Sequence, residues 1–251
     1  MYEERFYRGI SRPDDLECFE VVCKETDLFC CTKGNLKSFI EERAISLRYK
    51  IENYIKQRPE FLESLSPIEY DRFAPDIVKE MIEASACIGV GPMACVAGAI
   101  AEFIGRDIEK HSDEFIIENG GDIFLKTNKY RNVLIYAQDS PFSERLGIRV
   151  SPHNRPYGIC TSSGTVGHSL SLGKADAVCI VGESSLFCDG LATFIGNIVK
   201  KNEDISFAIE KAKTFKQIRG ILIVMGDKLG AWGDIELVQP KTMKNVKARN
   251  L

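Results

Sequence analysis

Apolar residues recur along this chain at two spacings, and the spacing separates the predicted helices from the predicted strands. The clearest helical stripe follows Asn35 and consists of Leu36, Phe39, Ile40, Leu47, Ile51, Tyr54 and Ile55. Charged residues fill the positions between them, so the pattern predicts a long amphipathic helix over residues 35–58 that ends at Pro59. The same spacing predicts helices over 75–87, 185–200 and 204–215.

Shorter apolar runs bounded by turn residues predict strands. Two of these predictions are hairpins, over 17–32 around a polar turn and over 114–126 around Asn119-Gly120-Gly121, which tolerates positive φ. Single strands are predicted over 1–10, 132–138, 146–151, 158–162, 175–182, 220–227 and 235–239. Because the strands cluster instead of alternating regularly with helices, the pattern favours an α+β fold with mixed or antiparallel sheets.

Composition narrows the classes of partner. The apolar fraction of 44% suits a globular core, and a net charge of −3 gives no reason to expect a nucleic acid as partner. No run of 18 apolar residues predicts a membrane span, and the charged N-terminus lacks an apolar signal segment. A cytoplasmic location with no membrane contact is therefore the default expectation.

Nine cysteines are many for such a chain, but their number is odd and no secretory signal accompanies them. We therefore expect no disulfide framework, and the absence of any Cys-x-x-Cys disfavours a zinc knot or a thioredoxin-type redox site. Most of these cysteines are predicted to be small buried apolar residues.

The segment 88–105 (IGVGPMACVAGAIAEFIG) is a predicted helix of small residues behind a glycine-rich entrance that includes Gly91. Such a helix allows another backbone or a ligand to approach closely, and its N-terminus presents free N–H groups. Tight packing on a sheet, a ligand site at the entrance and a subunit contact all remain open.

The segment 158–178 (GICTSSGTVGHSLSLGKADAV) is rich in hydroxyl groups. Thr161, Ser162 and Ser163 offer donors, Gly164 lets the main chain turn toward a ligand, and His168 titrates near neutral pH. A polar turn and a cradle for phosphates both fit. A Ser–His hydrolase is disfavoured because no Gly-x-Ser-x-Gly elbow is present.

Asp189 and Thr193 are four residues apart, so on a helix they share a face. A carboxylate and a hydroxyl are hard oxygen ligands that suit Mg²⁺. Spacing alone also fits an ordinary aspartate near a helix N-terminus.

Taken in order, GPMACVAGAIAE, ENGGDIF, CTSSGTVGHS and CDGLATFIGN resemble the motifs of the ApbE superfamily, and the match looks like a cytoplasmic branch of it. Its best-known members are FAD:protein FMN transferases, which split FAD with Mg²⁺ and attach FMN to a Thr or Ser of a partner protein. The resemblance covers about residues 85–200. It implies one ApbE-like domain over 1–251, with the helix over 35–58 as an added layer.

The resemblance also implies roles for individual residues. Asp189, Thr193 and the carbonyl of Ala94 match the positions that hold Mg²⁺, and His168 matches a candidate acid–base residue. The positions that line the flavin nucleotide pocket are matched by Asn119, Gly120, Gly121, Thr161, Ser162 and Gly164. A metal there would offset charge on a transferring phosphoryl group.

Two departures keep alternatives open. The transferases carry Ala-Lys-Gly where Ala94 precedes Cys95, and their Asp-Pro-x-Thr-Gly loop is absent after His168. Cys95, Cys160 and Cys188 each lie inside a motif, so a persulfide-handling protein with Cys160 as a catalytic thiol is a second hypothesis. A non-catalytic ligand sensor is a third, and a homo-oligomer fits any of them.

Overall fold

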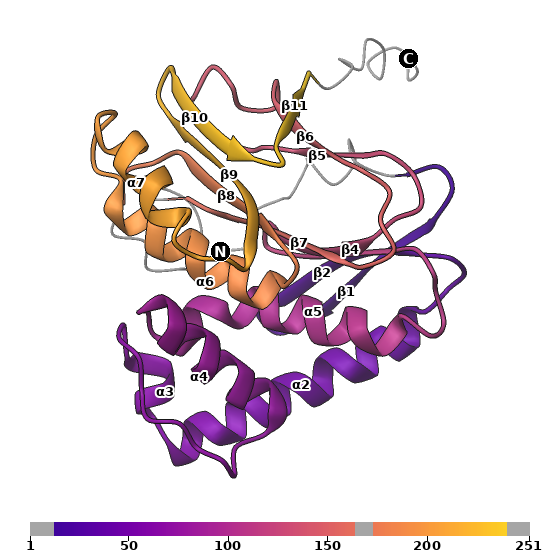
Figure 1. Ribbon diagram of the computed structural model, residues 1–251. Helices are drawn as coiled ribbons and strands as arrows, with labels where there is room; N and C mark the ends of the chain where they lie inside the picture. The colour runs from indigo at the N-terminus through magenta and orange to yellow at the C-terminus, as the bar shows by residue number, and fades with distance from the viewer. Residues whose placement is uncertain (1–12, 164–172, 240–251) are drawn as a thin grey trace, which may run out of the picture.

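The strands form two antiparallel sheets in the computed structural model, which describes residues 13–163 and 173–239 (Figure 1). The larger sheet runs in the order β1-β2-β3-β4-β7-β8-β9-β10, and the smaller in the order β11-β6-β5. The strands of the larger sheet are β1 (Glu17–Cys23), β2 (Thr26–Thr32), β3 (Phe115–Asn119), β4 (Asp122–Lys126), β7 (Tyr157–Ser162), β8 (Ala177–Gly182), β9 (Ile218–Met225) and β10 (Lys228–Gly233). Those of the smaller sheet are β5 (Arg131–Leu134), β6 (Gly147–Val150) and β11 (Glu236–Val238).

Helices cover one face of the larger sheet, and the smaller sheet covers part of the other face (Figure 1). The helices are α2 (Lys37–Gln57), α3 (Glu60–Glu63), α4 (Asp76–Ile88), the 3₁₀ turn η1 (Pro92–Cys95), α5 (Val96–Ile108), α6 (Ser185–Ile198) and α7 (Asp204–Ala212). Alternate residues of the central strands face the helices, and the residues between them face the smaller sheet. The architecture is therefore α+β with antiparallel sheets flanked by helices.

Both predicted hairpins are confirmed. Strand β1 pairs with β2, and β3 pairs with β4 through a turn in which Gly120 and Gly121 have φ of 68° and 99°. The sequence pattern missed β10, which pairs with β9 at the edge of the larger sheet. Most residues of β10 are exposed, so its sequence lacks the apolar alternation that marks a half-buried strand.

The sequence predicted no disulfide framework, but it did not reveal the one disulfide among the described residues, which joins Cys18 and Cys31. These two residues lie directly opposite each other in the β1–β2 register, which places their side chains side by side. Of the remaining cysteines, Cys30, Cys95, Cys160, Cys179 and Cys188 are buried, as predicted for small apolar residues.

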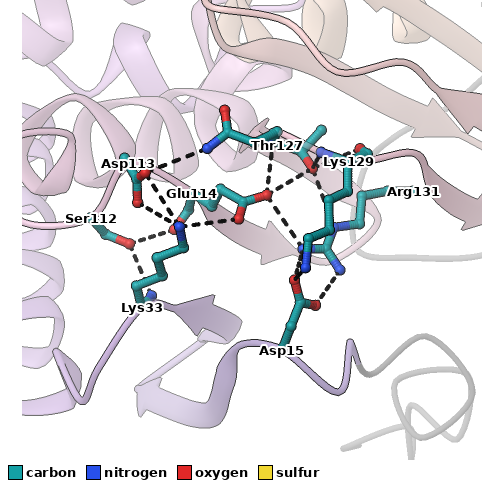
Figure 2. Close-up of polar contacts among 9 residues, drawn as sticks. Asp15, Lys33, Ser112, Asp113, Glu114, Thr127, Lys129 and Arg131 are labelled. Atoms are coloured by element: carbon teal, nitrogen blue, oxygen red, sulfur yellow. Dashed lines mark hydrogen bonds and ion pairs between the residues drawn. The ribbon is translucent and has the colours of Figure 1, made fainter.

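A polar cluster fixes the end of the β3–β4 hairpin opposite the glycine turn (Figure 2). Glu114, which is only 2% exposed, accepts from the Asn128 main-chain N–H at 2.8 Å and pairs with Lys33 and Arg131. Arg131 also binds both carboxylate oxygens of Asp15, and the resulting hydrogen bonds lower the pKa of Asp15. The cluster anchors the chain before β1 to the start of β5.

Within the described ranges, no single helix is both long and apolar enough to cross a membrane, although α4 together with η1 and α5 passes the same test as a pair bent by 105°.

Candidate functional site

Helices α5 and α6 approach each other so closely that only glycine fits at the crossing. A Cβ atom on Gly98 would lie 2.2 Å from the Ser185 carbonyl oxygen and 2.8 Å from the Asp189 Cβ. The Ser185 hydroxyl donates to the Gly98 carbonyl at 2.8 Å, which locks the first turn of α6 against α5. Gly158 on β7 gives α6 similar room, because a Cβ there would lie 2.4 Å from the Ser185 main-chain nitrogen. The small residues of the predicted segment 88–105 therefore serve backbone packing at this point.

This crossing places Asp189 in the interior. Asp189 is 8% exposed, and its Oδ2 accepts from the Gly98 main-chain N–H at 2.9 Å. Burial raises the pKa of Asp189 to about 7, although the N–H groups of Gly98 and Ala97 act in the opposite direction. No ion pair among the described residues involves this carboxyl. When Asp189 is ionised, only main-chain dipoles or a bound ligand can stabilise its negative charge.

The glycine turn after β3 lies beside the same helix start. The Asn119 side-chain amide donates to the Ala97 carbonyl at 3.1 Å, which connects the end of β3 to the first turn of α5. Glu118 accepts from the Gly121 main-chain N–H at 2.8 Å and so holds the turn. Asn119 is buried, whereas Gly120 is exposed. The structure thus brings the predicted Asn119 turn and Asp189 to the two sides of the α5 N-terminus.

A further predicted residue, Cys160 of β7, lies at the junction where α5, α6 and β7 meet. Cys160 is fully buried, and its thiol donates to the Ser185 carbonyl at 3.2 Å. In the sheet register, Cys160 lies opposite Asp122 of β4. Burial and the charge of Asp122 both raise the pKa of the Cys160 thiol well above its ordinary value. A thiol of this kind is a packing and hydrogen-bonding group rather than a ready nucleophile.

Thr193 lies on α6 and Ala94 on η1, two elements that pack together. Thr193 is 7% exposed and lies one helical turn beyond Asp189, on the same face of α6. Ala94 is half-buried inside η1, one residue before the buried Cys95. Gly91 precedes η1, and a Cβ there would lie 1.8 Å from the Ser64 carbonyl oxygen, so close packing accounts for glycine at this position.

The hydroxyl-rich segment is only partly described. Thr161 and Ser162 complete β7, Ser163 follows it, and Thr161 lies opposite Cys179 of β8. Ser162 is buried, whereas Thr161 and Ser163 are half-buried. Gly164 and the predicted acid–base residue His168 lie outside the described residues, so their predicted roles stay predictions.

The three motif cysteines lie in the packed interior around this junction. Cys95, Cys160 and Cys188 are all fully buried, and burial is the largest cause that raises the pKa of each thiol. Cys95 also fills the space beside Gly190, since a Cβ on Gly190 would lie 2.6 Å from the Cys95 sulfur. These surroundings suit close packing, and they disfavour the thiolate that persulfide transfer requires.

Two carboxyl groups of this region were not among the predicted residues. Asp122 directly follows the glycine pair of the turn and is 7% exposed, and Glu102 lies on α5 and is 3% exposed. Asp122 could have been found from the sequence, because it belongs to the same ENGGD motif as Asn119. No sequence pattern marked Glu102 as a functional residue, since a glutamate within an amphipathic helix is most often solvated.

Glu102 holds the N-terminus of α6 in place. One carboxylate oxygen, Oε2, accepts from the Ser184 hydroxyl at 2.7 Å and from the Leu186 main-chain N–H at 3.0 Å, while Oε1 pairs with Arg106. Ser184 in turn caps α6 by accepting from the Phe187 N–H at 3.2 Å. A carboxylate is favourable here because it faces the positive end of the helix dipole.

Glu102→Gln should lower the free energy of unfolding by about 1–3 kcal/mol, because a neutral amide with a single acceptor oxygen replaces a buried charged acceptor. Urea denaturation checks this. Glu80→Gln is the matched control, because Glu80 pairs with the same Arg106 at 2.9 Å from a more exposed position and should cost less than about 1 kcal/mol. Equal losses for the two variants would contradict the role given to Glu102.

The fold is that of the ApbE proteins of known structure. The structure matches the ApbE protein of Thermotoga maritima with a TM-score of 0.53 at 12% identity, covering 86% of this chain and 96% of that one. It also matches the flavinyl transferase ApbE of Pseudomonas stutzeri with a TM-score of 0.50 at 10% identity, covering 87% and 94%. At these identities the likeness establishes the fold.

The chain belongs to the family described as "AbpE bacteria", which matches residues 10–219. Among its relatives, a UPF0280 protein of Methanococcus aeolicus is 44% identical over 205 residues, covering 80% of this chain and 83% of the relative. A UPF0280 protein of Methanobrevibacter smithii is 38% identical over 214 residues, covering 83% and 90%. The resemblance inferred from the motifs is thereby confirmed at the level of family and fold.

Proposed function

We propose that this protein binds FAD, or a closely related flavin nucleotide, together with Mg²⁺ and acts as a flavin transferase. The observation that carries the proposal is the buried Asp189 carboxyl, fixed by the α5 N-terminus beside the Asn119 turn and without an ion-pair partner among the described residues. A buried carboxyl without a cation is costly, so such a group is more often a binding group than a structural one. The ApbE fold and family support the same reading.

The residues present fit a magnesium ion. No three His, Cys, Asp or Glu side chains within the described ranges come together as a metal-binding group, so a cation here needs hydroxyl and carbonyl oxygens as well as carboxylate. Asp189, Thr193 and the Ala94 carbonyl supply that set in the proposal, and all three are hard oxygen donors of the kind Mg²⁺ prefers. When bound, Mg²⁺ offsets the negative charge of a pyrophosphate and of the group transferred from it.

The remaining predicted residues bind and orient the nucleotide. The glycine turn and the end of β7 lie next to each other, since a Cβ on Gly121 would lie 3.9 Å from the Thr161 carbonyl oxygen. In the proposal the nucleotide contacts Asn119, Gly120, Gly121, Thr161, Ser162, Ser163 and Gly164. Thr161 and Ser163 are half-buried. The transfer joins a hydroxyl oxygen of a protein acceptor to the phosphorus of FMN and breaks the pyrophosphate P–O bond, so that AMP leaves. In the proposal His168 takes the proton that the acceptor hydroxyl loses.

The test is to mix the purified protein with FAD in the presence and absence of Mg²⁺, measure binding by calorimetry and separate the products by chromatography. We expect Mg²⁺-dependent binding and release of AMP, with FMN appearing when water replaces the protein acceptor. Absence of FAD binding under both conditions would overturn the proposal. Binding without AMP release would instead identify a ligand sensor on the same scaffold.

A further inference from the structure

Asp122 is a buried carboxyl group for which the proposed transfer needs no role. It begins β4 immediately after the glycine turn, is 7% exposed, and its Oδ1 has no hydrogen-bond partner among the described residues. An unsatisfied buried carboxylate oxygen is expensive, and each such atom in a folded protein calls for an explanation.

The surroundings of Asp122 are acidic, and no cationic side chain within residues 13–163 and 173–239 pairs with it. Asp189 and Glu118 both act on Asp122 electrostatically. Burial and the charge of Asp189 raise the pKa of Asp122 well above its ordinary value, although the Cys160 thiol and the Thr161 main-chain N–H act in the opposite direction. Two neighbouring buried carboxylates repel each other when both are ionised, so the doubly charged pair is unfavourable unless a cation binds.

A chain of contacts connects Asp122 with Asp189. Asp122 lies opposite Asn119 in the β3–β4 register, and the Asn119 amide donates to the Ala97 carbonyl. The next residue along α5, Gly98, donates its N–H to Asp189. On the other side, Asp122 lies opposite Cys160, whose thiol donates to the carbonyl of Ser185, one turn before Asp189.

We propose that Asp122 is the second carboxylate of the divalent cation site, and that its unpartnered Oδ1 faces the ion held by Asp189. This inference rests on the metal-binding part of the proposed function and extends it. A divalent cation compensates two carboxylates at once and supplies the missing partner of Oδ1. Oxygen ligands of this kind select Mg²⁺ or Mn²⁺ over softer metals.

The experiment measures Mn²⁺ binding directly, from the loss of the free Mn²⁺ signal in electron paramagnetic resonance, without flavin and without turnover. Wild type, Asp122→Asn and Asp189→Asn are compared with Asp27→Asn, a control that removes another buried aspartate, from β2. Asp27 is adjacent to Leu28, whose side chain packs on the helix side, so Asp27 faces the opposite side of the sheet. We expect Asp122→Asn to raise the Mn²⁺ dissociation constant about tenfold or more and Asp27→Asn to leave it unchanged.

Thermal unfolding in EDTA and in Mg²⁺ separates metal binding from a structural role. Asp122→Asn should be at least as stable as wild type in EDTA, because it removes a repulsive charge, and it should lose most of the gain in unfolding temperature that Mg²⁺ gives wild type. Lower stability of this variant in EDTA would overturn the inference, because it would reveal a structural partner for the carboxylate.

The outcomes also distinguish this inference from the proposed function. Weaker Mn²⁺ binding in Asp189→Asn but not in Asp122→Asn would overturn the role of Asp122 and leave the proposed function intact. No Mn²⁺ binding by wild type would overturn both the inference and the metal-binding part of that function.

Discussion

Gly98→Ala should lower the free energy of unfolding by about 3 kcal/mol or more, the upper range for forcing an atom into a packed interior. The added Cβ would lie 2.2 Å from the Ser185 carbonyl oxygen and 2.7 Å from its carbon, and main-chain atoms cannot move aside as a side-chain tip can. Helices α5 and α6 would have to separate. That movement would lengthen the bond from the Ser185 hydroxyl to Gly98 and the bond from Gly98 to Asp189.

The sign of this effect is informative, because glycine to alanine within a helix ordinarily stabilises by about 1 kcal/mol. Urea denaturation checks the prediction, with Gly34→Ala as control. Nothing lies within 4 Å of a Cβ on Gly34, whose φ of 81° alone should cost about 1–2 kcal/mol. A Gly98→Ala protein as stable as wild type would show that the helices do not cross at this distance.

Asp189→Asn should reduce the Mg²⁺-dependent release of AMP from FAD at least about 100-fold, since the change removes the charged ligand of the proposed metal site. Stability should be kept or increased, because an amide oxygen can still accept from the Gly98 N–H and the buried charge of Asp189 is removed. The assay is chromatography of AMP at a fixed FAD concentration over a range of Mg²⁺ concentrations.

Asp139→Asn is the matched control for Asp189→Asn, because it removes one negative charge from an exposed position in the β5–β6 connection and should retain wild-type activity. If Asp189→Asn releases AMP at the wild-type rate, Asp189 is not the metal ligand. A parallel loss of activity and of folded protein would likewise contradict the assignment, since the expected loss concerns activity alone.

Local patterns were sufficient for most of the fold. The apolar stripe after Asn35, the glycine turn after Asn119 and the alternating central strands each carry their signal within a few residues, and each has its counterpart in the structure. The motif order was also sufficient to identify the family. Strand β10 was missed because its residues are exposed at a sheet edge, where burial imposes no pattern.

The sequence by itself determined most of the elements, the family and the presence of Asp189 and Thr193 on one helix face, because those properties depend on near neighbours along the chain. Only the tertiary structure decided which groups meet. It placed Asp122 of β4 within electrostatic reach of Asp189 of α6 across 67 residues of sequence, and it brought the Cys160 thiol of β7 to the Ser185 carbonyl of α6. The physical reason is that burial and charge repulsion depend on contacts between strands and helices far apart in the chain, which no local spacing encodes.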